Sequence, residues 1–141
     1  MKRAMKKNKK GFTLIEILLV LAIIGTIAAM VVPRLAGRSE QAKVSIAKVD
    51  VGSNISSALK LYELDNGTYP SSAQSLDALT KKPTQGSSPR NWNGPYLEKE
   101  PVDPWGRKYQ YQFPGTHGKS YDLYSFGPKE KDEKGRITNW G

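Results

Sequence analysis

The chain contains no cysteine and only one histidine among its 141 residues. The missing cysteines exclude disulfide bonds, thiolate metal ligands and a cysteine nucleophile. The single histidine, His117, excludes a cluster of metal-binding histidines and any mechanism that needs two histidines within one chain. Acidic residues are also few, with 13 Asp and Glu against 22 Lys and Arg, so the formal net charge is +9. This length leaves room for one domain rather than two.

The excess positive charge is concentrated at the start of the chain. Six basic residues lie within the first ten positions, at Lys2, Arg3, Lys6, Lys7, Lys9 and Lys10. Subtracting these six from +9 leaves +3 for the remainder, which does not suggest a groove that follows nucleic-acid phosphates. Membrane topology and anionic lipids explain a basic cluster in front of an apolar segment. We therefore expect a membrane and no nucleic acid as a partner.

A long apolar run follows the basic cluster and extends from Phe12 to Val32. Four of its residues are not apolar, namely Thr13, Glu16, Gly25 and Thr26. A helix of this length spans roughly 30 Å, the thickness of the hydrocarbon core of a bilayer. The preceding basic residues predict a cytoplasmic N-terminus and a C-terminal part on the other side of the membrane. A secretory signal peptide is the main alternative, but its apolar core is usually shorter and ends at small residues that mark a cleavage site.

An amphipathic helix is predicted for residues 34–64, directly after the apolar run. Apolar residues recur there at helical spacing in two sets, Val51, Ile55, Leu59 and Tyr62, and Ala42, Ile46 and Val49. Pro33 lies between the two segments, where it either kinks the helix or marks the exit from the membrane. We expect one helix from about Thr13 to Leu64, ended by the turn residues 65–67.

The C-terminal half predicts a small antiparallel sheet connected by loops. Residues 108–113 and 120–126 indicate two strands joined by a turn at 114–118, and residues 136–140 indicate a third. Residues 71–82 predict a short helix with Leu76 and Leu79 facing inward. His117 lies in the Gly-rich turn, where we expect a solvent-exposed residue rather than a general base. Residues 103–106 predict a tight turn with Trp105 buried.

The sequence contains none of the common motifs of hydrolases, nucleotide-binding proteins or zinc peptidases. We therefore predict that the chain is not an enzyme and has no catalytic residues. Glu16 needs a specific explanation, because a charged residue at the bilayer centre costs about 2.5–3.5 kcal/mol. It either reaches the membrane surface or finds a positive partner. Cleavage after Gly11 would create such a partner, the new α-ammonium group of Phe12, within the chain or in a neighbouring one.

The segment Lys9 to Glu16, KKGFTLIE, resembles the class III signal sequence of type IV pilins and pseudopilins. In that family a membrane-embedded aspartyl peptidase cuts after the glycine on the cytoplasmic side and methylates the new N-terminus. The resemblance implies cleavage between Gly11 and Phe12 and N-methylation of Phe12. It also implies that Glu16 pairs with the N-terminus of Phe12 in an adjacent subunit during assembly.

Sequence blocks further along the chain narrow the family. YELDNGTYP, SLDAL, WNGPYL, DPWGRKYQY and HGKSYDLYSFG follow one another between residues 62 and 127. In this order they resemble the major pseudopilins of type II secretion systems over nearly the whole chain. The resemblance implies an α+β, type IV pilin-like fold, in which a long N-terminal helix, first transmembrane and then amphipathic, packs on a small antiparallel C-terminal sheet. The expected segments are a cleaved leader (1–11), a transmembrane half-helix (12–32), an amphipathic half-helix (33–64) and a loop-rich sheet region (65–141) that forms one globular domain with 33–64.

The function that this resemblance implies is structural. The subunit would be stored in the inner membrane, with its C-terminal domain in the periplasm, and would polymerise into a helical pseudopilus that helps export folded proteins across the outer membrane. Expected partners are the prepilin peptidase and methyltransferase, further copies of the chain, minor pseudopilins and the inner-membrane secretion platform. A type IV pilin, a competence pseudopilin and a lone membrane-anchored binding domain are the alternatives. The absence of cysteine argues against a pilin, because many pilins carry a C-terminal disulfide loop.

One segment, residues 125–136, departs from the family pattern, and we call it the C-terminal loop. Major pseudopilins of this type usually bind calcium there through aspartates and carbonyl groups, but Lys129 and Arg136 occupy two expected aspartate positions. The loop holds three carboxylates and four cations, Glu130, Asp132, Glu133, Lys129, Lys131, Lys134 and Arg136. Because calcium needs clustered oxygen ligands, we expect no metal site and a loop held by salt bridges and by packing of Trp140.

Overall fold

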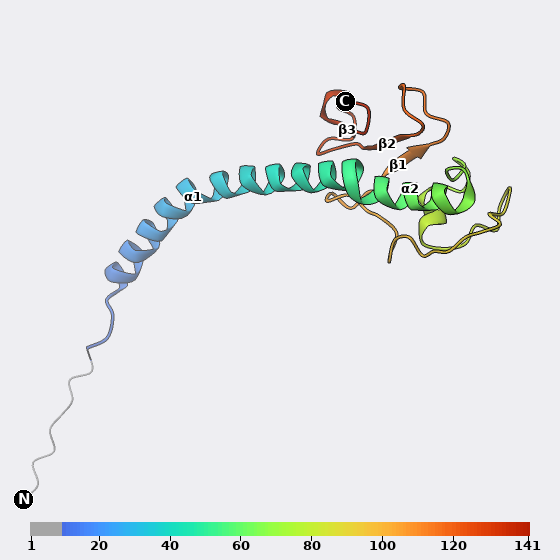
Figure 1. Ribbon diagram of the computed structural model, residues 1–141. Coiled ribbons are helices and arrows are strands. Elements are labelled where there is room, and N and C mark those ends of the chain that lie inside the picture. Colours follow the sequence, from blue (N-terminus) through green and yellow to red (C-terminus); the bar gives the residue numbers. More distant parts are fainter. Residues whose placement is uncertain (1–9) are drawn as a thin grey trace, which may run out of the picture. The chain divides into compact units, whose positions relative to one another are not determined.

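The computed structural model describes residues 10–141, so residues 1–9 of the expected leader lie outside the described residues. The chain divides into two compact units, one up to Arg38 and one from Ser39 to Gly141. Its elements in chain order are α1 (Leu14–Val49), the π-helical turn η1 (Asp50–Asn54), α2 (Ile55–Asn66), the 3-10 helix η2 (Leu76–Leu79), β1 (Gln110–Gln112), β2 (Asp122–Ser125), the 3-10 helix η3 (Glu133–Gly135) and β3 (Ile137–Thr138) (Figure 1).

The helical segment runs without interruption from Leu14 to Asn66, close to the expected bounds. Pro33 lies inside α1, so the helix continues through the proline although that residue has no N–H to donate. Gly67 ends α2 in the left-handed conformation, with a φ of 80°, and its N–H donates to the Glu63 carbonyl at 2.7 Å. This glycine cap confirms the turn expected at residues 65–67.

The π-helical turn η1 determines which residues of the helix face the core. Ala47, Val51, Ile55 and Leu59 are each at most 1% exposed and follow one another at intervals of four. In an α-helix four residues advance about 40° beyond one turn, so such a series would drift off the buried face. The wider π turn takes up this excess and keeps the side chains on one face.

The second set of apolar residues at helical spacing does not face the core. Ile46 and Val49 are each 54% exposed, and Ala42 is exposed as well, whereas Ala47 is buried. The residues Ala42, Ile46 and Val49 all precede η1. On that part of the helix the residues that contact the core are Val44 and Ala47.

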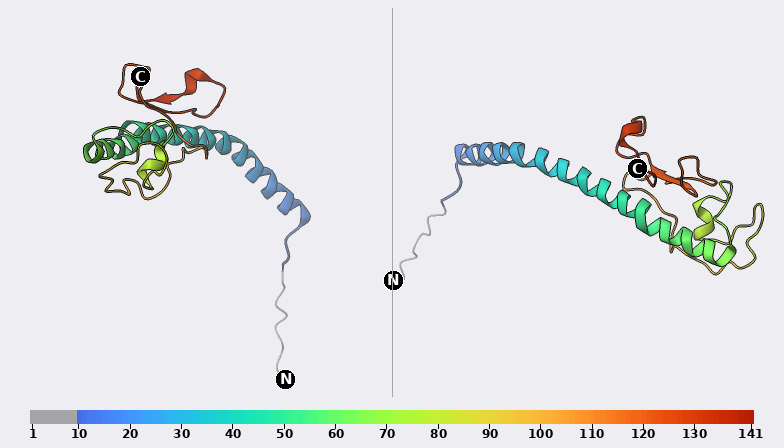
Figure 2. Two further views of the ribbon diagram at one scale, coloured as in Figure 1. Left: turned by 90° about the vertical axis from the view of Figure 1, so that its right-hand side faces the viewer. Right: turned by 45° about the horizontal axis from the view of Figure 1, so that its top comes forward.

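The sheet has the order β1-β2-β3, and both strand pairs are antiparallel. Leu123 pairs with Tyr111, and Ser125 pairs with Ile137. Leu123 and Ile137 join the helix residues, η2 and Tyr109 in one buried cluster. Figures 1 and 2 show α2 between the sheet on one side and the η2 segment on the other. The three strands and the short helix expected from the sequence are confirmed, each shorter than its predicted range.

Candidate processing and assembly site and the C-terminal loop

The region around the expected cleavage point precedes the first helical residue. Gly11 and Phe12 lie before α1, and Phe12 is 88% exposed. No heavy atom lies within 4 Å of the position that a Cβ at Gly11 would take. The bond between Gly11 and Phe12 therefore lies in exposed, non-helical chain, where a second protein can reach it.

Glu16 forms a reciprocal cap with Thr13 at the start of α1. The Thr13 N–H donates to Glu16 Oε2 at 2.8 Å, and the Glu16 N–H donates to Thr13 Oγ1 at 3.3 Å. This capping box satisfies two of the N–H groups that a helix leaves without partners at its first turn. It also holds the carboxylate at the positive end of the helix dipole. The Thr-x-x-Glu spacing in the sequence is the signal that indicates this cap.

Phe12 and Glu16 line the same shallow hollow in the surface at the start of the helix. Apolar side chains line the rest of it, namely Ile17, Leu19, Val20 and Leu21. The structure thus brings together the expected processing residue and the expected assembly residue. Glu16 is the only ionisable side chain in residues 12–32, so its carboxylate is the one fixed charge available for a polar contact in this segment.

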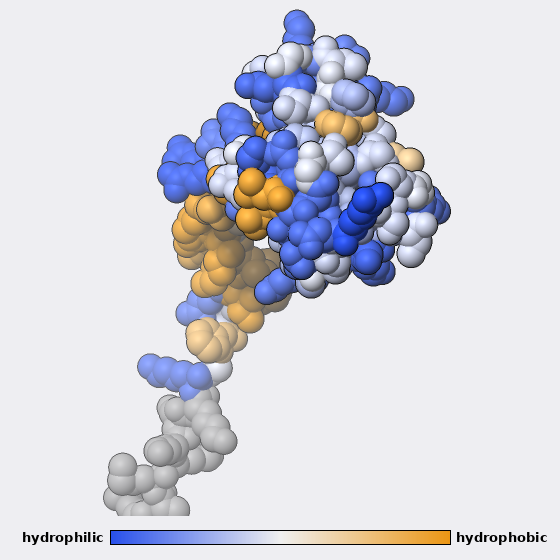
Figure 3. Space-filling view, turned by 45° about the vertical axis from the view of Figure 1, so that its right-hand side comes forward, coloured by the Kyte–Doolittle hydropathy of each residue, from blue (hydrophilic) through white to orange (hydrophobic). Residues whose placement is uncertain are grey.

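The apolar residues of α1 are exposed along the whole first half of the helix. Leu14, Ile15, Leu18, Leu21, Ile24 and Ile27 are all more than half exposed. Figure 3 shows these hydrophobic side chains gathered on the helix, in contrast to the mainly hydrophilic surface elsewhere. One helix in the described part of the chain is long and apolar enough to cross a membrane, and this is that helix. Its composition fits the expected transmembrane segment.

A buried carboxylate, Asp103, organises the segment before the sheet. Its Oδ1 accepts hydrogen bonds from the backbone N–H of Trp105 at 3.1 Å and of Arg107 at 2.8 Å. Its Oδ2 accepts the Ser125 hydroxyl at 2.7 Å. The tight turn expected at 103–106 is confirmed by a bond of 2.9 Å from the Gly106 N–H to the Asp103 carbonyl.

Trp105 is only partly buried, so the expectation of a buried tryptophan in that turn was wrong. Its indole Nε1–H donates to Glu40 Oε2 at 3.1 Å, and its ring packs against the edge of the core. The residue that the turn buries is Asp103, at 4% exposure. A carboxylate can be buried there because three donors surround it.

Arg107 connects this carboxylate to the C-terminal loop. Its Nε lies 3.9 Å from Asp103 Oδ2, and its Nη2 donates to the carbonyl oxygen of Gly127. The Gly127 N–H donates to the Ser125 hydroxyl at 3.1 Å. Gly127 has a φ of 76°, and a Cβ at this position would collide with the carbonyl oxygen of Gly135. Glycine is therefore required where the two ends of the loop approach each other.

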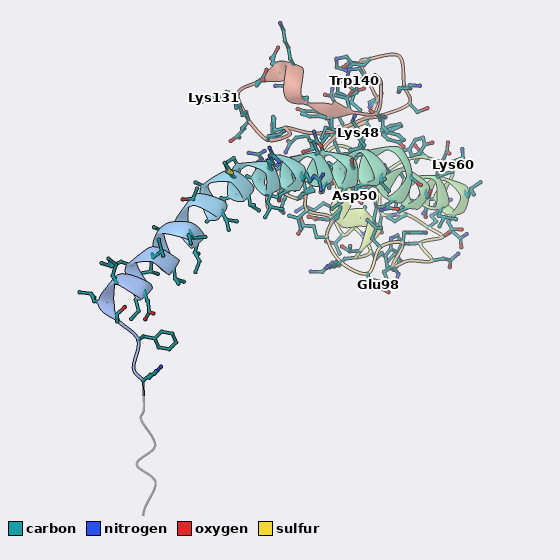
Figure 4. All side chains as sticks on the ribbon, turned by 90° about the vertical axis from the view of Figure 1, so that its left-hand side faces the viewer. Lys48, Asp50, Lys60, Glu98, Lys131 and Trp140 are labelled. Atoms are coloured by element: carbon teal, nitrogen blue, oxygen red, sulfur yellow. The ribbon has the colours of Figure 1, made fainter. Side chains whose placement is uncertain are left out.

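Arg136 holds the other end of the C-terminal loop. Its guanidinium carbon lies 5.4 Å from the ring centroid of Tyr124 and 5.6 Å from that of Phe126. Its Nη2 lies 3.6 Å from Glu133 Oε1, which confirms the expected salt bridge. Trp140 packs against Tyr124 with ring centroids 5.7 Å apart. Lys131 and Trp140 both lie on the sheet side of the helix, opposite Glu98 (Figure 4).

The oxygen atoms of this loop are not arranged to coordinate a calcium ion. Asp132 Oδ1 accepts the Lys134 N–H at 3.1 Å and so caps η3, while Glu133 pairs with Arg136. The Gly127 carbonyl already accepts a hydrogen bond from Arg107. Within residues 10–141, no group of three or more His, Cys, Asp or Glu side chains is placed to hold a metal ion. Several of the oxygen atoms that calcium could use here are thus engaged by donors of the chain itself.

His117 is exposed in the turn, as expected, and it also makes specific contacts. Its Nδ1 lies 2.8 Å from Asp122 Oδ2, and its ring stacks on Trp140 with centroids 4.0 Å apart. Asp122 is 2% exposed and also accepts the Thr116 N–H at 3.0 Å and the Thr116 hydroxyl at 2.7 Å. Burial alone would raise the pKa of Asp122, but these hydrogen bonds and His117 outweigh it and lower the pKa to about 2.

Asp122 therefore gives the fold a specific dependence on acid. Because its pKa in the folded protein lies below the unfolded value of about 3.9, its ionised form stabilises the fold. That contribution is complete above about pH 4 and is lost as the pH falls through about 2. We expect Asp122→Asn to reduce the free energy of unfolding at neutral pH by about 2 kcal/mol and to flatten its pH dependence in this window.

Urea unfolding of the full chain in detergent, repeated across this pH range, measures both effects. Asp77→Asn is the matched control, because Asp77 is an exposed carboxylate of the same globular unit. Parallel pH profiles for the wild type and Asp122→Asn would contradict the assignment.

Comparison with known proteins agrees with the fold and with the N-terminal signature. Residues 34–140 match the family described as type II secretion system protein G, and residues 6–32 match the prokaryotic N-terminal methylation motif. The type II secretion system core protein G of Pseudomonas aeruginosa is 51% identical over 140 residues, covering 96% of this chain and 97% of the relative. The protein of the same name from Escherichia coli K12 is 43% identical over 136 residues, covering 95% and 92%.

A solved structure supports the same assignment. The crystal structure of the major pseudopilin from the type 2 secretion system of enterohaemorrhagic Escherichia coli superposes with a TM-score of 0.66 and 37% sequence identity. The superposition covers 75% of this chain and 89% of that one. The resemblance inferred from the sequence blocks and the type IV pilin-like fold are thereby confirmed, and the chain belongs to the type II secretion system protein G family.

Proposed function

We propose that this chain is the major structural subunit of a type II secretion pseudopilus, a filament that helps move folded proteins across the outer membrane. One observation carries the proposal: a methylation motif over residues 6–32 directly precedes a protein G match over residues 34–140 on a single chain. The exposed apolar helix and the separate globular unit support it, because a subunit of this kind needs a membrane anchor and a folded domain. The role is structural rather than enzymatic.

Two further elements of the proposal concern the N-terminus. A prepilin peptidase and methyltransferase cuts between Gly11 and Phe12 and methylates Phe12. The exposed, non-helical position of this bond before α1 and the methylation motif support this assignment. Glu16 then serves assembly by pairing with the ammonium group of Phe12 in an adjacent copy.

The location follows from the same features. The subunit spans the inner membrane once through residues 12–32, with a cytoplasmic N-terminus and a periplasmic globular unit, and becomes part of a periplasmic filament when assembled. The basic residues before the apolar run support this orientation. Its partners are further copies of itself, minor pseudopilins and the inner-membrane secretion platform.

Deletion of the gene in the native host tests the proposed function. Secreted proteins should accumulate folded in the periplasm, and the wild-type gene should restore their release. Electron microscopy of sheared cells that overproduce the subunit should show filaments that an antibody to residues 39–141 labels. Unchanged secretion in the deletion strain would contradict the proposal.

Gly11→Leu is expected to block processing. The substitution meets nothing within this chain, because no heavy atom lies within 4 Å of a Cβ at Gly11. A failure to cut would therefore arise from the peptidase, which has to accommodate the residue before the scissile bond. Intact-mass measurement should find residues 12–141 with one added methyl group for the wild type, and the full chain for the variant.

Gly25→Leu is the matched control for this prediction. Gly25 is also a glycine with open space around it, but it lies within the apolar helix. We expect it to be processed like the wild type. A mature N-terminus at Phe12 in Gly11→Leu would show that the cleavage site does not discriminate by size at this position.

A further inference from the structure

We propose that the guanidinium groups of Arg107 and Arg136 close the C-terminal loop from within the chain, so that the loop folds without a divalent cation. The C-terminal loop joins β2 to β3 and contains only the short helix η3. Its fold therefore depends on contacts that connect its two ends to each other and to the rest of the globular unit. These contacts converge on the two arginines.

The first arginine is fixed at its backbone before it reaches the loop. The Arg107 N–H donates to Asp103 Oδ1 at 2.8 Å, and the Arg107 carbonyl accepts the Asp103 N–H at 2.7 Å. The Asp103 side chain is fully buried, so this anchor has a single arrangement. The guanidinium extends from it to the Gly127 carbonyl, twenty residues further along the chain. Arg107 thus joins the segment before the sheet to the first turn of the loop.

The Gly127 carbonyl lies at the closest approach of the two ends of the loop. The left-handed conformation of Gly127 places it against Gly135, and the Ser125 hydroxyl receives its N–H. A carbonyl oxygen in this position requires a positively charged or hydrogen-bonding partner. A guanidinium supplies both and keeps its charge at every physiological pH. Arg107 therefore serves at this oxygen as a bound cation would serve.

The second arginine acts at the far end of the loop. Arg136 lies over the rings of Tyr124 and Phe126, at centroid distances of 5.4 and 5.6 Å, and so ties the end of the loop to its beginning. It also lies 3.6 Å from Glu133 Oε1, which places a positive charge beside one of the three carboxylates of the loop. The two guanidinium groups therefore hold both ends of the same loop.

Charge reinforces this arrangement against a metal ion. The loop itself carries four cations and three carboxylates, and the charge of Arg107, which reaches it from outside, is offset by the buried carboxylate of Asp103. A divalent cation entering this region would meet net positive charge at short range and would have to displace an arginine from its carbonyl. If the proposed function holds, assembly of this subunit into a filament therefore does not require calcium.

Thermal unfolding and amide hydrogen exchange of the purified full chain in detergent test this inference. In millimolar Ca²⁺ and in EDTA, the wild type should have the same Tm and the same exchange rates in residues 126–136. Arg107→Ala should lower Tm and raise exchange in this segment, and Arg107→Lys should restore part of the protection because the charge remains. Arg136→Ala should raise exchange mainly around Tyr124 and Phe126.

Lys108→Ala is the matched control, because Lys108 is the next residue along and its side chain is 67% exposed. It should leave loop exchange unchanged. A Ca²⁺-dependent rise in Tm or in loop protection of the wild type would overturn the inference, and so would unchanged loop exchange in Arg107→Ala. Should Arg107→Ala fail to fold, the comparison of the wild type in Ca²⁺ and in EDTA and the loop exchange of Arg107→Lys still test the inference.

The dependence on filament assembly is tested separately. Filament yield from cells grown with a calcium chelator should equal the yield with added calcium. Absence of filaments under both conditions, with secretion unaffected by deletion of the gene, would contradict the proposed function but not the closure of the loop. Filaments that form only with calcium would contradict the closure and leave the proposed function standing.

Discussion

Glu16→Ala is expected to abolish filament formation while the subunit is still inserted into the membrane and still cleaved. Insertion should become easier, since the variant loses a carboxylate that costs about 2.5–3.5 kcal/mol at the bilayer centre. Cleavage should persist, because Gly11 and Phe12 lie outside the helix in which residue 16 sits. Assembly should fail, because the α-ammonium group of Phe12 in the neighbouring copy would lose its counter-charge in lipid.

The capping box makes a second substitution at this position more informative. Alanine removes the charge and also the hydrogen bond of 2.8 Å from the Thr13 N–H. Glutamine removes the charge but can keep that bond, because glutamine serves in a capping box as glutamate does. We expect Glu16→Gln to lose filaments as Glu16→Ala does. Membrane fractionation, intact mass and filament counts by electron microscopy measure the three steps in one preparation.

Thr26→Ala is the control for this pair. Thr26 is another polar residue of the same helix, and its hydroxyl bonds only to the Ala22 carbonyl of that helix, at 2.8 Å. It should assemble normally. Normal filament yield in Glu16→Gln would show that the carboxylate acts through the helix cap alone and that the pairing between subunits is wrong.

The capping box and the proposed pairing describe two partners of one carboxylate. In the single chain Glu16 is held by Thr13, so the charge is not bare before assembly. Exchange of this partner for an ammonium group replaces one polar contact by another, so little net stability is gained. The pairing then fixes how far one helix lies along its neighbour, because a misaligned pair leaves two charges in lipid. In the proposed pairing, Glu16 would thus determine register rather than affinity.

Much of the fold could be predicted because it depends on local patterns. The apolar run predicted the exposed half of α1. The residues Asp65-Asn66-Gly67 predicted the end of α2, which the structure has at a glycine with positive φ. The aromatic and apolar residues of 120–126 predicted the central strand, because strands favour such residues. The order of the elements and the type IV pilin-like architecture followed from these features and from the sequence blocks.

The features that could not be predicted depend on residues far apart in the chain. Ile46 and Val49 fit a helical period, but which face of the helix is buried depends on distant contacts such as the bond of 2.7 Å from the Tyr109 hydroxyl to Asp50. Arg107 lies in a turn-rich segment, and nothing near it in sequence indicates that Gly127 is its acceptor. The contacts of His117 could not be predicted because Asp122 and Trp140 approach it only in the folded sheet.

Asp103→Ala should cause the largest loss of stability of any single substitution considered. The carboxylate is buried, and its removal leaves the Ser125 hydroxyl and the N–H groups of Trp105 and Arg107 without their acceptor. It also leaves the Arg107 guanidinium without the anion beside it, although that group is partly exposed and screened by water. We expect the free energy of unfolding to fall by about 3 kcal/mol, to be measured by urea denaturation of the full chain in detergent.

Two other variants separate charge from hydrogen bonding at this site. Asp103→Asn keeps one acceptor oxygen at nearly the same size, so it should lower the free energy of unfolding less than Asp103→Ala does. It should still weaken the contact with Arg107, because the negative charge is gone. Glu100→Ala, which removes an exposed carboxylate paired with Lys108 at 2.5 Å, should change the free energy of unfolding by less than about 1 kcal/mol. Should Asp103→Ala lose no more than Glu100→Ala, Asp103 would not organise the segment before the sheet, and Arg107 would need another anchor. The loss in free energy of unfolding should therefore be largest for Asp103→Ala, smaller for Asp103→Asn and smallest for Glu100→Ala. This order follows from burial, because water can replace the partners of an exposed carboxylate but not those of a buried one.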